Sequence, residues 1–239
     1  MAYARTRSSE LRSGGLPAAP PLLTLRGVTK RWAAGAPPIL DELELELGAG
    51  ELVGVTGRNG TGKTTLLRVI AGLLVPERGE LRLAGIDPER DRAGYNRRLG
   101  LLTAGNAGLY ARLGVDENLA FWAAQAMLPR ARRRAAVNDV LELFALHEIR
   151  GRRVDRLSMG QRQRLRLALA FLHGPRLLLL DEPAASLDAA GVAIVAAALQ
   201  RHRAAGGAAI VAAPSTDQVP LGPDRTLEFA GGRLCEVDR

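Results

Sequence analysis

The sequence predicts an α/β fold with a central parallel sheet, and three observations support this prediction. The apolar segment 51–56 runs directly into a loop, 57–64, that matches the phosphate-binding pattern G-x-x-x-x-G-K-[ST] at every position. A helical pattern with an apolar face follows at once. Further along, the apolar run 177–180 ends in two carboxylates, which is typical of a central parallel strand whose carboxyl end opens on a site.

The amino-terminal segment is predicted to be a disordered tail over residues 1–21. It mixes Arg, Ser, Gly and Pro and has no apolar stretch of the kind found in a signal peptide. Nothing in the remaining sequence resembles an interdomain linker. We therefore expect one domain over residues 22–239.

This domain is expected to open with a β-rich layer. Segments 22–28 and 43–47 alternate apolar and polar residues, the period of half-buried strands, and a Gly- and Pro-containing break at 35–38 separates them. Segment 80–84 has the pattern of a further strand.

The loop 57–64 has the composition that a polyphosphate requires. Glycines let backbone N–H groups approach the phosphates, and the helix start adds its positive end. Lys63 is expected to reach the β- and γ-phosphates, and the Thr64 hydroxyl to coordinate Mg²⁺. A Gly-rich turn with a chance lysine is the alternative, and the order of strand, loop and helix argues against it. The residues expected to bind the triphosphate are Gly57, Asn59, Gly60, Thr61, Gly62, Lys63, Thr64 and Thr65.

The middle of the chain is predicted to be helical. Residues 118–144 are rich in Ala, Leu and Arg, so we expect a helical subdomain over roughly 92–155. After it, Ser158 is a candidate N-cap, with Gln161 at the capping-box position, for a helix that continues through 165–173. Taken alone, this segment indicates only that a helix begins.

The two carboxylates after the apolar run predict metal binding and catalysis. Asp181 can hold Mg²⁺ through its water shell, and Glu182 is placed to orient or deprotonate a water that attacks the γ-phosphate. A core strand followed by a charged turn is the simpler interpretation of this run alone. The phosphate loop upstream argues against it.

Composition narrows the possible functions. The chain has a single cysteine, Cys235, which excludes an intrachain disulfide, and no apolar run long enough to span a membrane. Its net charge of +8 invites a nucleic-acid interpretation. However, the arginines are scattered apart from 130–134 and 150–156, and aromatic residues are few. Solvated helix faces, or docking to an anionic partner or membrane surface, suit this charge better than specific nucleic-acid binding.

The order of the motifs resembles the ATP-binding subunits of ABC transporters. After the phosphate loop come Leu-Ser-x-Gly-Gln at 157–161, Asp-Glu-Pro at 181–183 and Ser-Leu-Asp at 186–188. The resemblance runs from Leu22 onward, and Leu-Ser-x-Gly-Gln before an Asp-Glu strand is not shared by P-loop proteins in general. It implies a P-loop NTPase of the ABC type, with a RecA-like core, an antiparallel β layer and a helical subdomain.

Within this family, segment 99–121 looks like the drug, polysaccharide and ABC-2 type exporter subunits, and 188–193 is similar to haem-export subunits of cytochrome c maturation. The resemblance implies an ATPase that drives a separate integral-membrane permease. It would lie in the cytoplasm, peripheral on the inner face of the cell membrane, and dock through the helical insertion around 111–153.

The resemblance also implies a head-to-tail dimer, of two copies or of two different subunits, with two Mg-ATP molecules between them. One subunit would supply the phosphate loop and the carboxylates, and the other would supply Ser158, Gly160 and Gln161. Trp32 would stack on adenine, the alternative being a core tryptophan. Asp188 would arrange the interface between the two sites.

Three positions depart from the family pattern. Met159 replaces a glycine of the signature, and the loop after segment 99–103 has no glutamine, although Asn106 could act with a shorter reach. Where the family has a histidine, segment 209–213 runs into Pro214 and Ser215. The chain's histidines are interpreted as structural or surface residues, namely His147, His173 and His202.

Losing a preorganised contact to developing charge costs on the order of 10²–10³ in rate. We therefore expect binding of Mg-ATP with slow hydrolysis, unless Ser215 or Asn106 substitutes or a partner subunit completes the second site. Two other functions stay open. One is a catalytically weak regulatory or scaffold subunit, and the other is a soluble ABC ATPase acting on nucleic acid or ribosomes.

Overall fold

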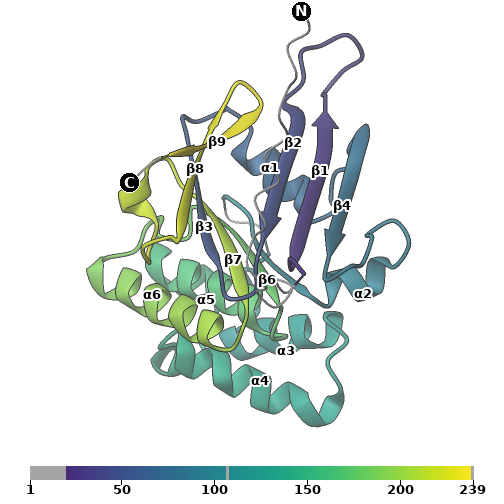
Figure 1. Ribbon diagram of the computed structural model, residues 1–239. Helices are drawn as coiled ribbons and strands as arrows, with labels where there is room; N and C mark the ends of the chain where they lie inside the picture. The colour runs from purple at the N-terminus through teal and green to yellow at the C-terminus, as the bar shows by residue number, and fades with distance from the viewer. Residues whose placement is uncertain (1–19, 106–107, 238–239) are drawn as a thin grey trace, which may run out of the picture.

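The computed structural model describes residues 20–105 and 108–237, which form two sheets and a set of helices (Figure 1). Most of the predicted tail and Asn106 lie outside the described residues. The α/β prediction is confirmed, and each predicted strand is present.

The smaller sheet is the predicted β-rich layer. It is antiparallel, with the order β2-β1-β4, and pairs Leu23 with Leu47 on one side and with Leu83 on the other. The alternating pattern reflects burial of one face, since Leu23 and Leu25 are inaccessible to solvent while Arg26 is exposed. The strands are β1 (Leu23–Lys30), β2 (Leu40–Leu47) and β4 (Arg78–Leu83).

The larger sheet carries the phosphate loop and the carboxylates. Its order is β5-β6-β7-β3-β8-β9, and every neighbouring pair is parallel except β8 with β9. The carboxyl ends of β3, β6 and β7 therefore meet at one edge. The strands are β3 (Leu52–Thr56), β5 (Leu99–Leu102), β6 (Leu177–Asp181), β7 (Ala208–Ala212), β8 (Arg225–Ala230) and β9 (Arg233–Val237).

Helices cover both faces of the larger sheet. The helices are α1 (Lys63–Ile70), α2 (Arg92–Asn96), α3 (Val115–Gln125), α4 (Arg130–Leu143), α5 (Met159–Phe171) and α6 (Ala189–Ala204), with short 3₁₀ turns at 147–149, 154–156 and 216–218. In Figure 1, α3 and α4 lie at the end of the molecule farthest from β9, below α5 and α6.

Two apolar cores explain why β6 is apolar from Leu177 to Leu180. Leu177 and Leu179 pack into the core shared with α1 and the smaller sheet, whereas Leu178 and Leu180 pack into the core shared with α3 to α6. All four are inaccessible to solvent. A strand between two cores cannot alternate with polar residues, so its pattern is a continuous apolar run.

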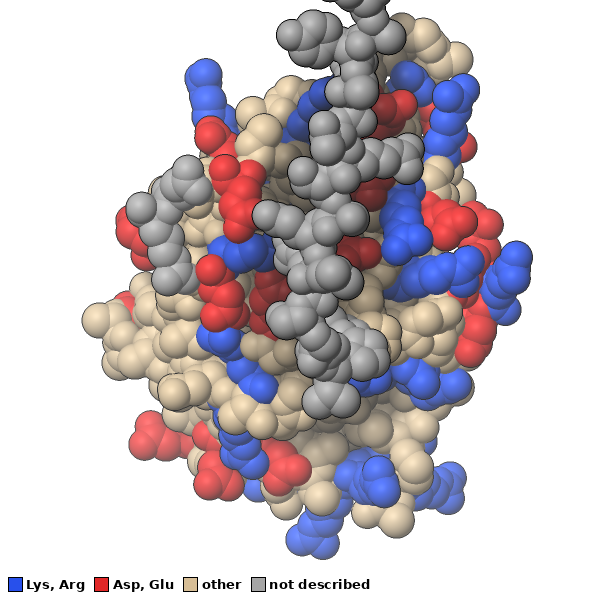
Figure 2. Space-filling model, viewed as in Figure 1, with Lys and Arg blue, Asp and Glu red and all other residues tan. Residues whose placement is uncertain are grey.

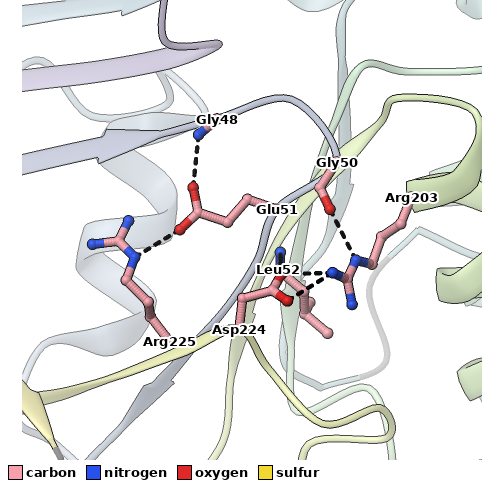
Figure 3. A network of polar contacts seen from close by, with 7 residues as sticks. All are labelled: Gly48, Gly50, Glu51, Leu52, Arg203, Asp224 and Arg225. Atoms are coloured by element: carbon pink, nitrogen blue, oxygen red, sulfur yellow. Dashed lines mark hydrogen bonds and ion pairs between the residues drawn. The ribbon is translucent and has the colours of Figure 1, made fainter. Parts of the chain in front are cut away.

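A polar network fixes the amino ends of β3 and β8 (Figure 3). Arg203, near the end of α6, donates to both carboxylate oxygens of Asp224 at 2.8 and 2.7 Å and to the carbonyl of Gly50 at 2.9 Å. The Asp224 carboxylate also accepts the first backbone N–H of β3 at 2.8 Å. Beside it, Arg225 donates to Glu51 at 2.6 Å. The network orients β3, whose other end leads into the phosphate loop.

Acidification is expected to destabilise the fold through His173 and His202. Their Nε2 atoms lie 3.0 Å from the Leu99 carbonyl oxygen and 3.1 Å from the Ala208 carbonyl oxygen. Burial lowers the pKa of both imidazoles below the ordinary value of 6.5. The unfolded chain thus takes up protons first as the pH falls through 6.5, and each histidine lowers the free energy of unfolding by at most about 1.4 kcal/mol per pH unit.

Urea unfolding between pH 8 and pH 5 measures this loss. His202→Gln should flatten the pH dependence, and His147→Gln, at an exposed position, is the matched control. An unchanged slope in a His173→Gln, His202→Gln double variant would contradict the assignment.

Candidate functional site

The phosphate loop lies between β3 and α1, as predicted. Lys63 is the first residue of α1 and only 6% exposed, and its ammonium donates to the carbonyls of Gly57 at 2.5 Å and Arg58 at 3.0 Å. No side chain caps the helix at Gly62. The amino end of α1 therefore presents backbone N–H groups and a positive charge to the same space, as an anion site requires.

Packing of the loop against β8 explains two of its glycines. A Cβ at Gly57, where φ is 140°, would lie 2.6 Å from the carbonyl oxygen of Phe229. A Cβ at Gly62, where φ is 124°, would lie 2.9 Å from the Phe229 ring and 3.1 Å from a side-chain carbon of Ile39. Both positions therefore need glycine for the fold of the loop, in addition to the approach of a phosphate.

Thr64 and Asp181 meet across the site. The Thr64 hydroxyl donates to the Asp181 carboxylate at 2.8 Å, and Asp181 is 4% exposed at the end of β6. Oxygen ligands of this kind suit Mg²⁺, which keeps several waters and binds substrate phosphates. The described residues contain no group of three or more acidic, His or Cys side chains that could hold a metal alone. Thr64 and Asp181 thus fit an Mg²⁺ ion whose coordination is completed by phosphate oxygens and water.

Glu182 lies at the junction of two cavities. One, of about 290 Å³, is lined by loop and α1 residues together with Trp32, Asp181 and Glu182. The other, of about 270 Å³, is lined by Glu182, Pro214 and Gln218, among others. The Glu182 backbone is held at φ 50°, and its N–H donates to the carbonyl of Ala212 at 2.9 Å.

Gln218 is the polar side chain that sequence reasoning missed. Ser215, a predicted substitute for the missing histidine, lines neither cavity at Glu182, whereas Gln218 lines the second one. The 3₁₀ turn Thr216–Gln218 after Pro214 brings it there. No periodicity or motif marks this position in the sequence.

Trp32 is not a core residue. The residue is 60% exposed on the connection between β1 and β2, and it lines the cavity that also contains Lys63. The core alternative is therefore wrong. The exposed indole is available to stack on a flat ring.

The residues predicted to act from a second subunit or to arrange the interface lie outside the cavity that contains Lys63. Ser158 caps α5 by accepting the N–H of Gln161 at 3.2 Å, while the Gln161 side chain accepts the N–H of Ser158 at 3.0 Å, which confirms the predicted capping box. Gly160 is close to the loop before α6, and Asp188 caps α6 through the N–H of Gly191 at 2.8 Å. None of Ser158, Gly160, Gln161 and Asp188 lines the cavity beside the phosphate loop.

An apolar groove of about 670 Å³ lies between α2, the end of β5, α3 and α5. Trp122, Met127 and Leu169 contribute apolar surface, and Arg97 and Arg166 contribute charge. Only the part of the helical insertion around the end of α3 lines this groove. Among the described residues, no helix is long and apolar enough to cross a bilayer.

Comparison with known proteins places these features in one family. Residues 40–185 match the family model described as ABC transporter. The cytochrome c biogenesis ATP-binding export protein CcmA of Bordetella bronchiseptica is 40% identical over 92% of this chain and 95% of its own length. The ABC transporter ATP-binding protein NatA of Bacillus subtilis is 38% identical over 62% of this chain and 60% of its own.

Solved structures agree in fold. A structure titled as the ATP binding subunit of an ABC transporter is 24% identical and superposes with a TM-score of 0.82, covering 90% of this chain and 89% of that one. The cbiO1 structure from Clostridium perfringens, described as part of the ABC transporter complex cbiONQ, gives 0.79 at 24% identity, with 91% and 88% covered.

Proposed function

The chain belongs to the ABC transporter family of ATP-binding proteins, and from this premise we propose that it binds Mg-ATP at the phosphate loop and powers a separate membrane permease. The observation that carries the proposal is the Thr64–Asp181 hydrogen bond of 2.8 Å. It brings the two expected Mg²⁺ ligands together beside Lys63, on elements far apart in the sequence.

Within this site, each group has a distinct task. Lys63 and the N–H groups of α1 would hold the β- and γ-phosphates, and Trp32 would stack on adenine. Mg²⁺ bound at Thr64 and Asp181 would neutralise phosphate charge. Glu182 would orient or deprotonate the attacking water.

A second subunit would complete the site. Because Ser158, Gly160 and Gln161 lie away from the Lys63 cavity of their own chain, they are free to meet the γ-phosphate held by another chain. In this arrangement the start of α5 supplies N–H groups in trans. ATP binding would then close the dimer, and hydrolysis would reopen it.

Hydrolysis is expected to be slow in the isolated protein. The described loop residues Ala104 and Gly105 offer no side-chain amide, and Ala213 and Pro214 follow β7, where the resemblance implies a histidine. Gln218 is better placed than Ser215 to replace it, because it shares a cavity with Glu182. These departures also favour the second candidate function, a catalytically weak regulatory or scaffold subunit.

The direction of transport is proposed from the name of one relative. CcmA is named an export protein, so we propose export as the direction, with the protein peripheral on the cytoplasmic face of the membrane. The apolar groove beside α3 is the proposed docking surface. Figure 2 shows Lys and Arg interspersed with Asp and Glu on the face it views, which argues against a nucleic-acid surface on that face.

Trp32 provides the test of nucleotide binding. Stacking on adenine should quench its emission when Mg-ATP is titrated, and Trp122, which lies in the groove, supplies the unchanging background. Trp32→Phe should lose the quench but keep most of the affinity, whereas Trp32→Ala should weaken binding roughly tenfold, as expected for a stacked aromatic pair. Equal affinity of Trp32→Ala and wild type, measured by calorimetry, would remove Trp32 from the site.

A further inference from the structure

One face of α5 carries two buried polar side chains that the proposed site does not use. Gln163 and Arg166 are three residues apart, so they lie one above the other, and they are 6% and 7% exposed. The Arg166 guanidinium donates to the Gln163 side-chain oxygen at 2.8 Å. Placing a guanidinium in this position has a cost, because burial lowers the pKa of Arg166.

Gln163 extends this hydrogen-bonded chain to the backbone just after β6, where Glu182 lies. Its amide nitrogen donates to the carbonyl of Pro183 at 3.1 Å and approaches the carbonyl of Glu182 at 3.4 Å. Together with the bond from the Glu182 N–H to Ala212, these contacts hold the backbone that carries the Glu182 carboxylate at its positive φ.

On its other side, Arg166 reaches the loop after β5 and the apolar groove. It donates to the carbonyl of Thr103, the first residue after β5, and it also lines the apolar groove. Thr103 lines the same groove. Two hydrogen-bonded side chains, Arg166 and Gln163, therefore connect the groove and the loop after β5 with the backbone of Glu182.

We propose that Arg166 is a positioning residue that sets the Glu182 carboxylate through Gln163 and makes it responsive to what occupies the groove. The inference rests on the proposed function, since it assigns Arg166 to the ATPase site and the groove to a partner. A partner segment that displaces Thr103 would pull on the guanidinium and thereby on the carbonyls beside Glu182. The described residues of the loop after β5 include no glutamine. Arg166 would therefore connect this loop to the attacking water through Gln163 and Glu182.

The test compares Arg166→Met with Arg164→Met. Arg164 is the matched control, because it lies on the same helix and donates to the carbonyls of Phe144 and Ala145 at 3.1 and 3.0 Å, away from Glu182. Arg166→Met should lower kcat about tenfold or more, the effect of losing the charged hydrogen bond to Gln163, and leave the ATP dissociation constant unchanged. Arg164→Met should alter neither quantity.

Two further measurements separate positioning from general loss of structure. Gln163→Met should lower kcat by a similar factor, and the double variant should be no worse than either single one, because both act in one chain of contacts. Hydrogen–deuterium exchange of residues 181–188 should accelerate in Arg166→Met and not in Arg164→Met. If Arg166→Met does not fold, Arg166→Lys, which keeps the charge but loses the forked geometry, should show the same pattern in weaker form.

Additive effects of the Arg166 and Gln163 variants, or unchanged exchange around Glu182, would overturn the proposal. The exchange arm needs no nucleotide. If the wild-type protein fails to bind ATP, the proposed function fails, and the exchange arm still decides whether Arg166 positions Glu182.

Discussion

Glu182→Gln is expected to abolish ATP turnover while leaving ATP binding intact. The substitution keeps the shape of the side chain and the backbone bond to Ala212, but an amide cannot accept the proton of the attacking water. Removal of a general base typically lowers kcat by roughly 10²–10⁴-fold. Phosphate release gives kcat, and quenching of Trp32 gives the affinity.

Two controls make this result interpretable. Gln218→Ala tests the other polar side chain at the same cavity, and it should lower kcat by a smaller factor if Gln218 helps to orient the water. Fast turnover by the wild-type homodimer would contradict the proposed slow site. Turnover unchanged by Ser215→Ala and Gln218→Ala would show that neither side chain replaces the missing histidine. Equal kcat in wild type and Glu182→Gln would mean that another group activates the water.

The parts of the site that local sequence determines could be predicted. The glycines and Lys63 of the loop act through their own backbone and neighbours, and the carboxylates follow a strand whose continuous apolar pattern reflects its position between two cores. The cap at Ser158 is equally local, since its partner Gln161 is three residues away.

Other features depend on contacts that the sequence does not reveal. Gln218 reaches the Glu182 cavity only because the chain turns after Pro214, and an isolated glutamine has no pattern. Arg166 looks like one more surface arginine in a helix that contains several, yet the fold buries it beneath the loop after β5. Its role depends on the position of β5 beside β6, a pairing of residues far apart in the chain.

A mixture of Lys63→Ala and Ser158→Glu subunits is expected to recover activity that neither variant has alone. Each homodimer would carry a lesion in both sites, since Lys63 belongs to one half of a site and Ser158 to the other. Glutamate at Ser158 would repel the γ-phosphate at the start of α5. In the mixed dimer both lesions fall in one site and the second site is intact. Differently tagged subunits allow the mixed dimer to be isolated, and its phosphate release and ATP affinity to be measured.

The matched control is a mixture of Lys63→Ala with Glu182→Gln. Both lesions then lie in the same half of a site, because Lys63 and Glu182 line one cavity of one chain. Every site of that mixed dimer keeps one lesion, so turnover should not return. If each subunit instead completed its own site, neither mixture would recover. If Ser158 served only as the cap of α5, the Ser158→Glu homodimer would keep its activity. Recovery in the first mixture alone therefore separates a site shared between two chains from a site within one.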